Sequence, residues 1–169
     1  MHNIVRWLAR RRIALGFIAG AAALWLARPT PGSLTYGAGV ALAGELIRIW
    51  AAGHLEKGRE VTMSGPYRLT RHPLYVGSTI MGLGLAIASA RWMVGVLVVV
   101  YLGITLSAAI AAEEAHLTEK FGEAYPAYRE GRMAGAIRRF SLQRAMRNRE
   151  YRAAIGLLAT LALLAWKAV

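Results

Sequence analysis

The sequence contains no cysteine and no aspartate, and it has few acidic residues of any kind. The absence of cysteine excludes disulfide bridges, thiolate metal sites and a cysteine nucleophile. The 4 histidines have no cysteine or aspartate partners, so we expect no metal site. Asp and Glu total 9 against 21 lysines and arginines, which gives a net charge of +12. This balance is typical either of nucleic-acid binding or of a membrane protein with basic loops on one side.

Long apolar stretches decide between these two interpretations. The chain of 169 residues is 56% hydrophobic, and its mean hydropathy is +0.38. The apolar residues gather in five runs, which are residues 13–27, 34–52, 74–90, 92–112 and 153–169. A helix that crosses a bilayer needs about 20 predominantly apolar residues. We therefore predict an all-α integral membrane protein with about five transmembrane helices.

The first apolar run follows a basic start, so a signal peptide is an alternative interpretation for it. The run ends in Trp25-Leu26-Ala27-Arg28-Pro29, which is a poor small-residue cleavage site, and more apolar runs follow. We therefore expect a retained helix. Residues 28–33 contain prolines and a glycine, as turns do, so residues 1–52 are predicted to form an N-terminal helical hairpin.

The positions of the basic residues predict the orientation. If the N-terminus is cytoplasmic and five helices alternate, nearly all lysines and arginines fall in cytoplasmic segments. The exceptions are Arg28, Arg48, Arg91 and Lys167. This follows the positive-inside rule, so the basic charge requires no nucleic acid as a partner. We expect a multi-pass protein of a bacterial inner (plasma) membrane, in contact with membrane lipids.

The densest run of side chains that could take part in binding or catalysis lies between the second and third apolar runs. It reads Gly65-Pro66-Tyr67-Arg68-Leu69-Thr70-Arg71-His72-Pro73-Leu74-Tyr75. Pro73 suits the first turn of a helix, whose free N–H groups can bind an anion together with Arg68 or Arg71. Tyr67 and Tyr75 can stack on a flat ring or cover a cation. Lipid phosphate and the membrane interface are the alternative partners of these side chains.

A second cluster begins at the adjacent pair Glu113 and Glu114. On a helix the two side chains point about 100° apart, so one can face neighbouring helices while the other faces outward. A carboxylate here can bind an ammonium, a sulfonium or a ribose diol. Together with an anion site and aromatic platforms, it suits a zwitterionic nucleotide-like ligand. S-adenosylmethionine fits this description, and a nicotinamide nucleotide fits it less well.

Apolar and aromatic residues recur at helical spacing after the glutamate pair. The stripe consists of Glu114, Leu117, Phe121, Tyr125 and Tyr128. This spacing predicts a cytoplasmic amphipathic helix over residues 113–128 that lies on the membrane or on the protein.

Glu45 and Arg48 stand at i,i+3 spacing within the second apolar run, so they share one helix face. They either neutralise each other near the cytoplasmic end or contact a cofactor or substrate. Among the histidines, we expect His54 in a solvated loop and His116 on the surface.

These two clusters, in this order and between apolar runs, resemble the isoprenylcysteine carboxyl methyltransferase family and the related bacterial phospholipid methyltransferases. The resemblance covers roughly His54 to Tyr128. It implies an enzyme that uses S-adenosylmethionine on the cytoplasmic side and takes a lipophilic acceptor from the bilayer. It implies that the cofactor-binding residues are Arg59, Glu60, Val61, Thr62, Tyr67, His72, Pro73, Leu74, Tyr75, Glu113 and Glu114, and the anion site described above adds Arg71.

The expected organisation is a single membrane-embedded methyltransferase domain. After the hairpin, residues 53–130 would form the cofactor-binding core, and residues 131–169 a basic segment and the last transmembrane helix. The acceptor would be an isoprenylcysteine-like carboxylate, a phospholipid amine or a similar group. Ala109 stands where the eukaryotic prenylcysteine enzymes carry an acceptor-binding arginine, which disfavours the first of these.

Two other functions are compatible with the same pattern. One is a membrane NADPH-dependent reductase of the sterol-reductase type, which would bind a nicotinamide nucleotide. The other is a non-enzymatic membrane protein whose basic face binds lipid or a partner.

Overall fold

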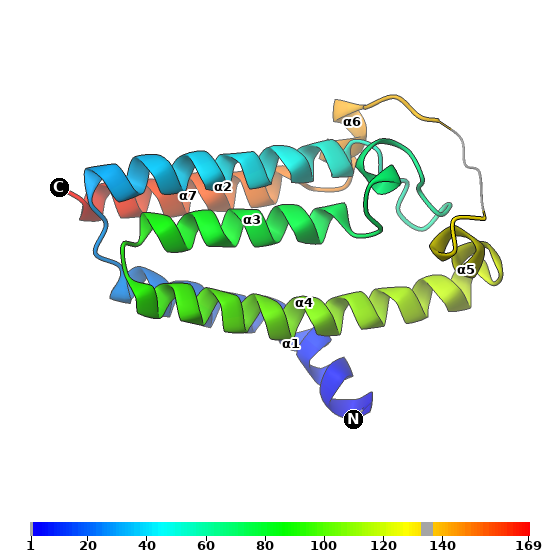
Figure 1. The fold of residues 1–169 in the computed structure, drawn as a ribbon, viewed down its shortest axis with the longest axis horizontal. Helices are drawn as coiled ribbons and strands as arrows, with labels where there is room; N and C mark the ends of the chain where they lie inside the picture. The colour runs from blue at the N-terminus through cyan, green and yellow to red at the C-terminus, as the bar shows by residue number, and fades with distance from the viewer. Residues whose placement is uncertain (1, 133–136) are drawn as a thin grey trace.

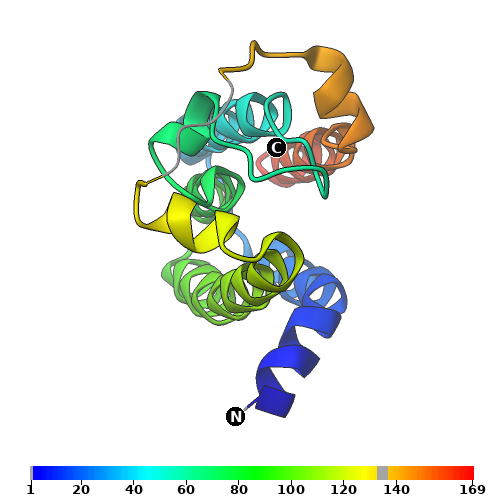
Figure 2. The ribbon, with the colours of Figure 1, turned by 90° about the vertical axis from the view of Figure 1, so that its right-hand side faces the viewer.

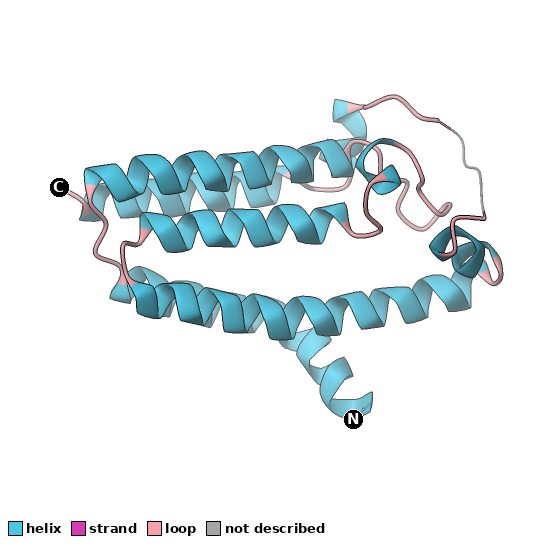
Figure 3. Cartoon of the chain, viewed as in Figure 1, coloured by secondary structure: helices cyan, strands magenta, loops and turns pink. Residues whose placement is uncertain are grey.

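The computed structural model describes residues 2–132 and 137–169 of the chain. Its elements are α1 (His2–Leu26), α2 (Pro31–Ala52), the short 3-10 helix η1 (Gly65–Arg68), α3 (Pro73–Ala88), α4 (Trp92–Phe121), α5 (Ala124–Arg129), α6 (Leu142–Arg147) and α7 (Tyr151–Lys167). There is no strand among the described residues (Figure 3). The predicted all-α class is confirmed.

The long helices lie in two layers. In Figure 1, α2, α3 and α7 run side by side, and α4 and α1 lie below them. Figure 2 looks along the helices and shows the same two layers from one end. The loop with η1 gathers there with α5 and α6. The short connections of α1 to α2 and of α3 to α4 lie at the opposite end. Both clusters singled out in the sequence therefore reach the same end of the molecule.

Local sequence signals set where these helices begin. Thr30 caps α2 through a reciprocal hydrogen-bond pair with Ser33, and Pro31 occupies the first turn. Pro73 opens α3, as predicted. A tight turn joins α3 to α4, and Ala90 adopts a φ of 50° there. This turn brings α3 and α4 into antiparallel order.

Small residues let α2 and α3 pack backbone against backbone. A Cβ added to Gly84 would lie 2.7 Å from both Ala41 Cα and Gly37 O, and one added to Gly77 would lie 2.7 Å from Gly44 O. No side chain fits into such gaps, so only glycine permits this approach. The contact fixes the start of α3 beside the end of α2, where the site lies.

The substitution Gly84→Ala is expected to lower the free energy of unfolding by about 1–3 kcal/mol, because the added methyl group forces the two helix backbones apart. Thermal unfolding of the detergent-purified protein measures this. Gly39→Ala is the matched control on α2, since a Cβ there meets nothing within 4 Å. Equal unfolding temperatures for the two variants would contradict the packing.

A short connection joins the two helices of the predicted N-terminal hairpin, but each has its main packing partner elsewhere. Although α1 and α2 follow each other, α1 packs mainly against α4, whereas α2 packs against α3 and α7 (Figure 1). The small-residue face of α2 is already covered by α3. The end of α1 is tied to the last helix instead, because Lys167 Nζ donates to the carbonyl oxygens of Leu24 at 2.6 Å and Ala27 at 2.7 Å.

The predicted separate helix over residues 113–128 is wrong in its bounds. Helix α4 continues through the glutamate pair to Phe121, and Gly122 then turns the chain with a φ of 52°. The last two residues of the predicted stripe, Tyr125 and Tyr128, lie in the separate short helix α5. No helix-breaking residue precedes Gly122 in this region, so the apolar run and the start of the stripe form one helix of 30 residues.

One helix among the described residues is long and apolar enough to cross a membrane. It is α4, whose most apolar window has a mean hydropathy of 2.4. The stretch Ala14–Leu26 and α3 are apolar but shorter. Length and composition therefore support one span directly, and the predicted five spans stay a prediction.

Candidate functional site

A cavity of about 760 Å³ opens between the two helix layers. Its walls come from α1, α3, α4, α5 and α7, from Arg48 of α2, and from the loop between α2 and α3. One end is polar and lies beside η1 and α5, and the other is apolar and reaches Val94 and Leu164.

Most residues predicted for cofactor binding line the polar end. They are Glu60, Val61, Thr62, Tyr67, Arg71, His72, Pro73, Leu74, Tyr75 and Glu113. Two of the predicted residues, Arg59 and Glu114, do not line the cavity. Arg59 is exposed at the outside of a turn in which its N–H donates to Glu56 O at 3.2 Å. Glu114 is turned toward His72 and Arg71 instead.

The two glutamates of the adjacent pair have different surroundings. Glu114 Oε1 lies 3.1 Å from His72 Nε2 and accepts a hydrogen bond from Arg71 at 3.1 Å. The Glu113 carboxylate is 3.9 Å from His72 Nδ1, beyond hydrogen-bond distance, and its side chain is 45% exposed. Because neighbours on a helix diverge, Glu114 orients His72 while Glu113 presents its carboxylate to the cavity.

Three tyrosines cover the polar end. The hydroxyl of Tyr128 donates to the backbone oxygen of Tyr67 at 2.8 Å, which joins α5 to η1. Burial raises the pKa of Tyr67, and burial together with the Glu114 carboxylate raises the pKa of Tyr125 to about 12. Both hydroxyls therefore stay protonated and can donate hydrogen bonds at neutral pH.

Tyr125 is the strongest sign that a ligand completes this site. Its side chain is 2% exposed and lines the cavity. Its hydroxyl lies near the Glu114 carboxylate but makes no hydrogen bond of normal geometry with any described residue. A buried donor without a partner is costly, so a polar ligand group in the cavity would stabilise it.

His54 is buried, so the expectation of a solvated loop histidine is wrong. Its Nδ1 lies 2.9 Å from Trp50 O, and its ring faces Phe140. A Cβ on Gly65 would lie 2.6 Å from the His54 ring, which explains why a glycine with a φ of 59° starts η1. His54 therefore supports the turn that carries Tyr67. His116 is exposed, as expected.

Arg48 is a cavity residue with more partners than its sequence neighbour Glu45. Its Nε lies 3.5 Å from Glu45 Oε2 but donates to Glu150 Oε1 at 2.7 Å, and a terminal nitrogen contacts Ser78 Oγ. The i,i+3 spacing pointed to Glu45 alone. Glu150 was missed because it lies 102 positions away in the sequence. Within the described residues, no group of His or Glu side chains could hold a metal ion.

Residues 45–124 match the family model described as phospholipid methyltransferase. The resemblance to the phospholipid methyltransferases is confirmed. The match begins at Glu45 and ends before Tyr125, so it includes both polar clusters of the cavity. It indicates a methyltransferase that acts on lipids. The comparisons with curated proteins and with solved structures gave no match.

The residues that match the family model leave part of the site outside them. Tyr125 and Tyr128 both line the cavity but follow the matched residues. Their place in the stripe that begins at Glu114 was the signal that could have added them to the candidate site. Residues 55–58 also line the cavity, although no motif or spacing in the sequence predicted them.

Proposed function

We propose that the protein transfers a methyl group from S-adenosylmethionine to a lipophilic acceptor at the cytoplasmic face of a membrane. The observation that carries this proposal is one cavity that joins a polar, aromatic end to an apolar end. Its polar end is built from the motifs of the phospholipid methyltransferase match. A soluble donor and a lipid acceptor need such a shared space to meet.

The residues at the polar end fit the charges of S-adenosylmethionine. Lys57 and Arg71 offer cations for its carboxylate, and Glu60 and Glu113 offer carboxylates for its ammonium or ribose. Tyr125 brings a buried hydroxyl that makes no hydrogen bond of normal geometry with the described residues. The charged side chains are thus complementary in sign to a zwitterion, and the tyrosine rings can stack on a flat ring.

The apolar end fits a hydrocarbon chain. It is lined by Gly16, Gly20 and Ala23 of α1, Leu85 of α3 and Leu102 of α4, together with other apolar residues. The space beside Gly20 is open, since a Cβ there meets nothing within 4 Å. Because lipid tails are as apolar as these side chains, an alkyl chain can move from the bilayer to this lining at little cost, whereas a polar acceptor would lose its hydrogen bonds to water. This supports a lipophilic acceptor over a soluble one.

The chain mainly aligns the reactants and excludes water. When bound, S-adenosylmethionine supplies a methyl group on a sulfonium sulfur, which keeps the electron pair of the broken C–S bond while the acceptor lone pair forms the new bond. Glu114 holds the His72 ring, and Tyr67 and Tyr125 close the polar end. A carboxylate acceptor needs no base, whereas an amine must lose a proton, and Glu113 and His72 are the cavity side chains able to take it.

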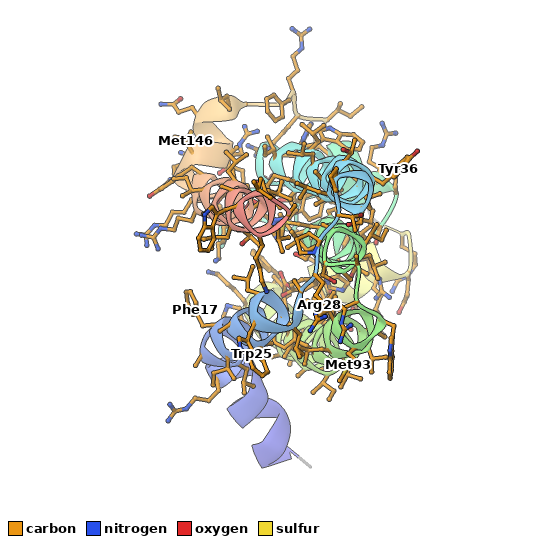
Figure 4. All side chains as sticks on the ribbon, turned by 90° about the vertical axis from the view of Figure 1, so that its left-hand side faces the viewer. Phe17, Trp25, Arg28, Tyr36, Met93 and Met146 are labelled. Atoms are coloured by element: carbon orange, nitrogen blue, oxygen red, sulfur yellow. The ribbon has the colours of Figure 1, made fainter. Side chains whose placement is uncertain are left out.

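The distribution of aromatic side chains supports a membrane-embedded orientation. Trp25, Tyr36, Trp92 and Trp166 are all at least 77% exposed, and they lie at the helix ends opposite the polar site. Figure 4 looks at this end and labels Trp25 and Tyr36. Exposed aromatic side chains of this kind form belts at membrane interfaces. The polar site would then face the cytoplasm, together with the basic segments.

Calorimetric titration of the detergent-purified protein with S-adenosylhomocysteine and with NADPH tests the choice of cofactor. We expect binding of S-adenosylhomocysteine with a dissociation constant on the order of 1–100 μM and no binding of NADPH. Each titration is run with and without added phospholipid, so that a requirement for acceptor is detected. Binding of NADPH alone would instead support the reductase, and binding of neither would support the non-enzymatic function.

A further inference from the structure

The chain between α5 and α7 contacts the loop that forms the rim of the cavity. We define the C-terminal strap as residues 137–150, which include α6, and the rim loop as residues 53–62. The rim loop lines the cavity with Leu55, Glu56, Lys57, Gly58, Glu60, Val61 and Thr62. The strap itself does not line it. Any influence of the strap on a bound ligand must therefore pass through the residues that it touches.

Side chains of the strap satisfy backbone groups of the rim loop. Arg144 donates to Gly53 O at 2.6 Å, and the Ser141 N–H donates to the same oxygen at 3.1 Å. Asn148 Nδ2 donates to Leu55 O at 2.9 Å. The rim loop has no regular ladder of its own hydrogen bonds, so these contacts decide the path of its backbone.

A buried carboxylate joins the strap to the rim loop most strongly. Glu56 is 8% exposed, and its Oε1 accepts a hydrogen bond from Arg144 Nε at 2.7 Å. Nitrogens of Arg138 and Arg147 lie 3.5 Å from the same oxygen. The hydrogen bond from Arg144 lowers the pKa of Glu56, so the carboxylate stays charged at neutral pH. Arg138 also donates to Glu60 at 2.7 Å.

Glu56 in turn closes the rim loop on itself. Its backbone N–H donates to Thr62 Oγ1 at 3.1 Å, which links the first and last parts of the loop. Phe140 of the strap covers Gly53 so closely that a Cβ there would overlap the ring. The same ring faces His54, which supports η1 and Tyr67. The strap is thus connected to two neighbouring parts of the polar end.

The strap reaches a second wall of the cavity through its last residue. Glu150 is 7% exposed and accepts a hydrogen bond from Arg48, which lines the cavity. Arg48 also contacts Ser78 near the start of α3. The rim loop and the start of α3 are therefore both held from the outside by the strap.

We propose that the C-terminal strap positions the donor pocket, with Glu56 and Arg144 as the positioning residues that hold the rim loop in its binding conformation. This rests on the proposed function, because the ligand that the rim loop would hold is the methyl donor. Glu56 lines the cavity but Arg144 does not, so a loss of donor affinity in Arg144→Gln reports the position of the rim loop rather than a lost contact with the donor.

The test uses the full-length protein and the variants Glu56→Gln, Arg144→Gln and their combination. We expect each single variant to bind S-adenosylhomocysteine about tenfold or more weakly, because a displaced wall misaligns ligand groups. The double variant should bind S-adenosylhomocysteine no more weakly than the weaker-binding single variant, since both substitutions remove the same contact. Hydrogen exchange should become faster in residues 53–62 and stay unchanged in α2 and α3.

Arg139→Gln is the control, because this arginine lies in the same strap with an exposed side chain. If Arg144→Gln does not fold, Arg144→Lys replaces it, since lysine keeps the charge but cannot donate from Nε. Wild-type affinity and wild-type exchange in both single variants would overturn the strap's role. An equal loss of protection over the whole chain would overturn it too, by assigning the contact to global stability.

Failure of the proposed function has a different signature. It would appear as absence of S-adenosylhomocysteine binding in the wild-type protein itself. The exchange of residues 53–62 in the variants would then still report whether the strap holds the rim loop.

Discussion

Glu113→Gln is expected to weaken the binding of S-adenosylhomocysteine by roughly 5- to 150-fold, which corresponds to about 1–3 kcal/mol. The Glu113 side chain lines the polar end of the cavity and is 45% exposed, with His72 Nδ1 at 3.9 Å. Its charge is therefore directed at the cavity rather than committed to a close partner. Loss of the charge removes an interaction with the donor and disturbs the surrounding fold little. Calorimetric titration measures the change.

Glu119→Gln is the matched control for this prediction. Glu119 lies on the same helix in an exposed position and does not line the cavity. Its replacement should leave donor affinity unchanged. Glu114→Gln adds a comparison, because Glu114 acts through His72 and should alter affinity without being a ligand itself. An unchanged affinity in Glu113→Gln would contradict the role assigned to this carboxylate.

Gly20→Leu is expected to lower kcat/KM for a long-chain acceptor by about tenfold or more while it leaves donor affinity unchanged. Gly20 lines the apolar part of the cavity and has open space around it. A leucine side chain can enter this space without displacing a neighbour, so it takes the volume that a hydrocarbon chain would occupy. Turnover of a short-chain acceptor analogue should fall less.

Gly103→Leu controls for the introduction of a leucine at a helical glycine. Gly103 also has open space around it, but it lies on α4 outside the cavity lining. This variant should keep the wild-type preference for chain length. If Gly20→Leu kept wild-type turnover of both long and short acceptors, the apolar part of the cavity would not be the acceptor site.

The parts of the fold that could be predicted from the sequence depend on local signals. The apolar runs predicted where the long helices lie, and Pro73 predicted the start of α3. Gly77 and Gly84 stand in an apolar run, where small residues permit the close helix contact that α2 and α3 make. The resemblance over residues 54–128 selected ten residues that meet at one end of the cavity, because each motif lies next to a helix end.

The parts that could not be predicted depend on long-range contacts. The packing of α1 on α4 is not encoded in the turn that follows α1, which only sets a chain reversal. The pairing of Glu56 with Arg144 joins residues 88 positions apart. The sequence contains many arginines, and nothing in it indicates which one pairs with Glu56. The burial of His54 likewise depends on Phe140, which arrives from the C-terminal strap.

Transfer of labelled methyl groups tests the central claim most directly. The purified protein is placed in nanodiscs made from a total bacterial lipid extract and incubated with S-adenosylmethionine that carries a labelled methyl group. Label in the lipid phase is then compared with the S-adenosylhomocysteine released. The account predicts equal amounts of both, with a strong reduction in Glu113→Gln and none in Glu119→Gln. Absence of labelled lipid, together with absence of released S-adenosylhomocysteine, would contradict it.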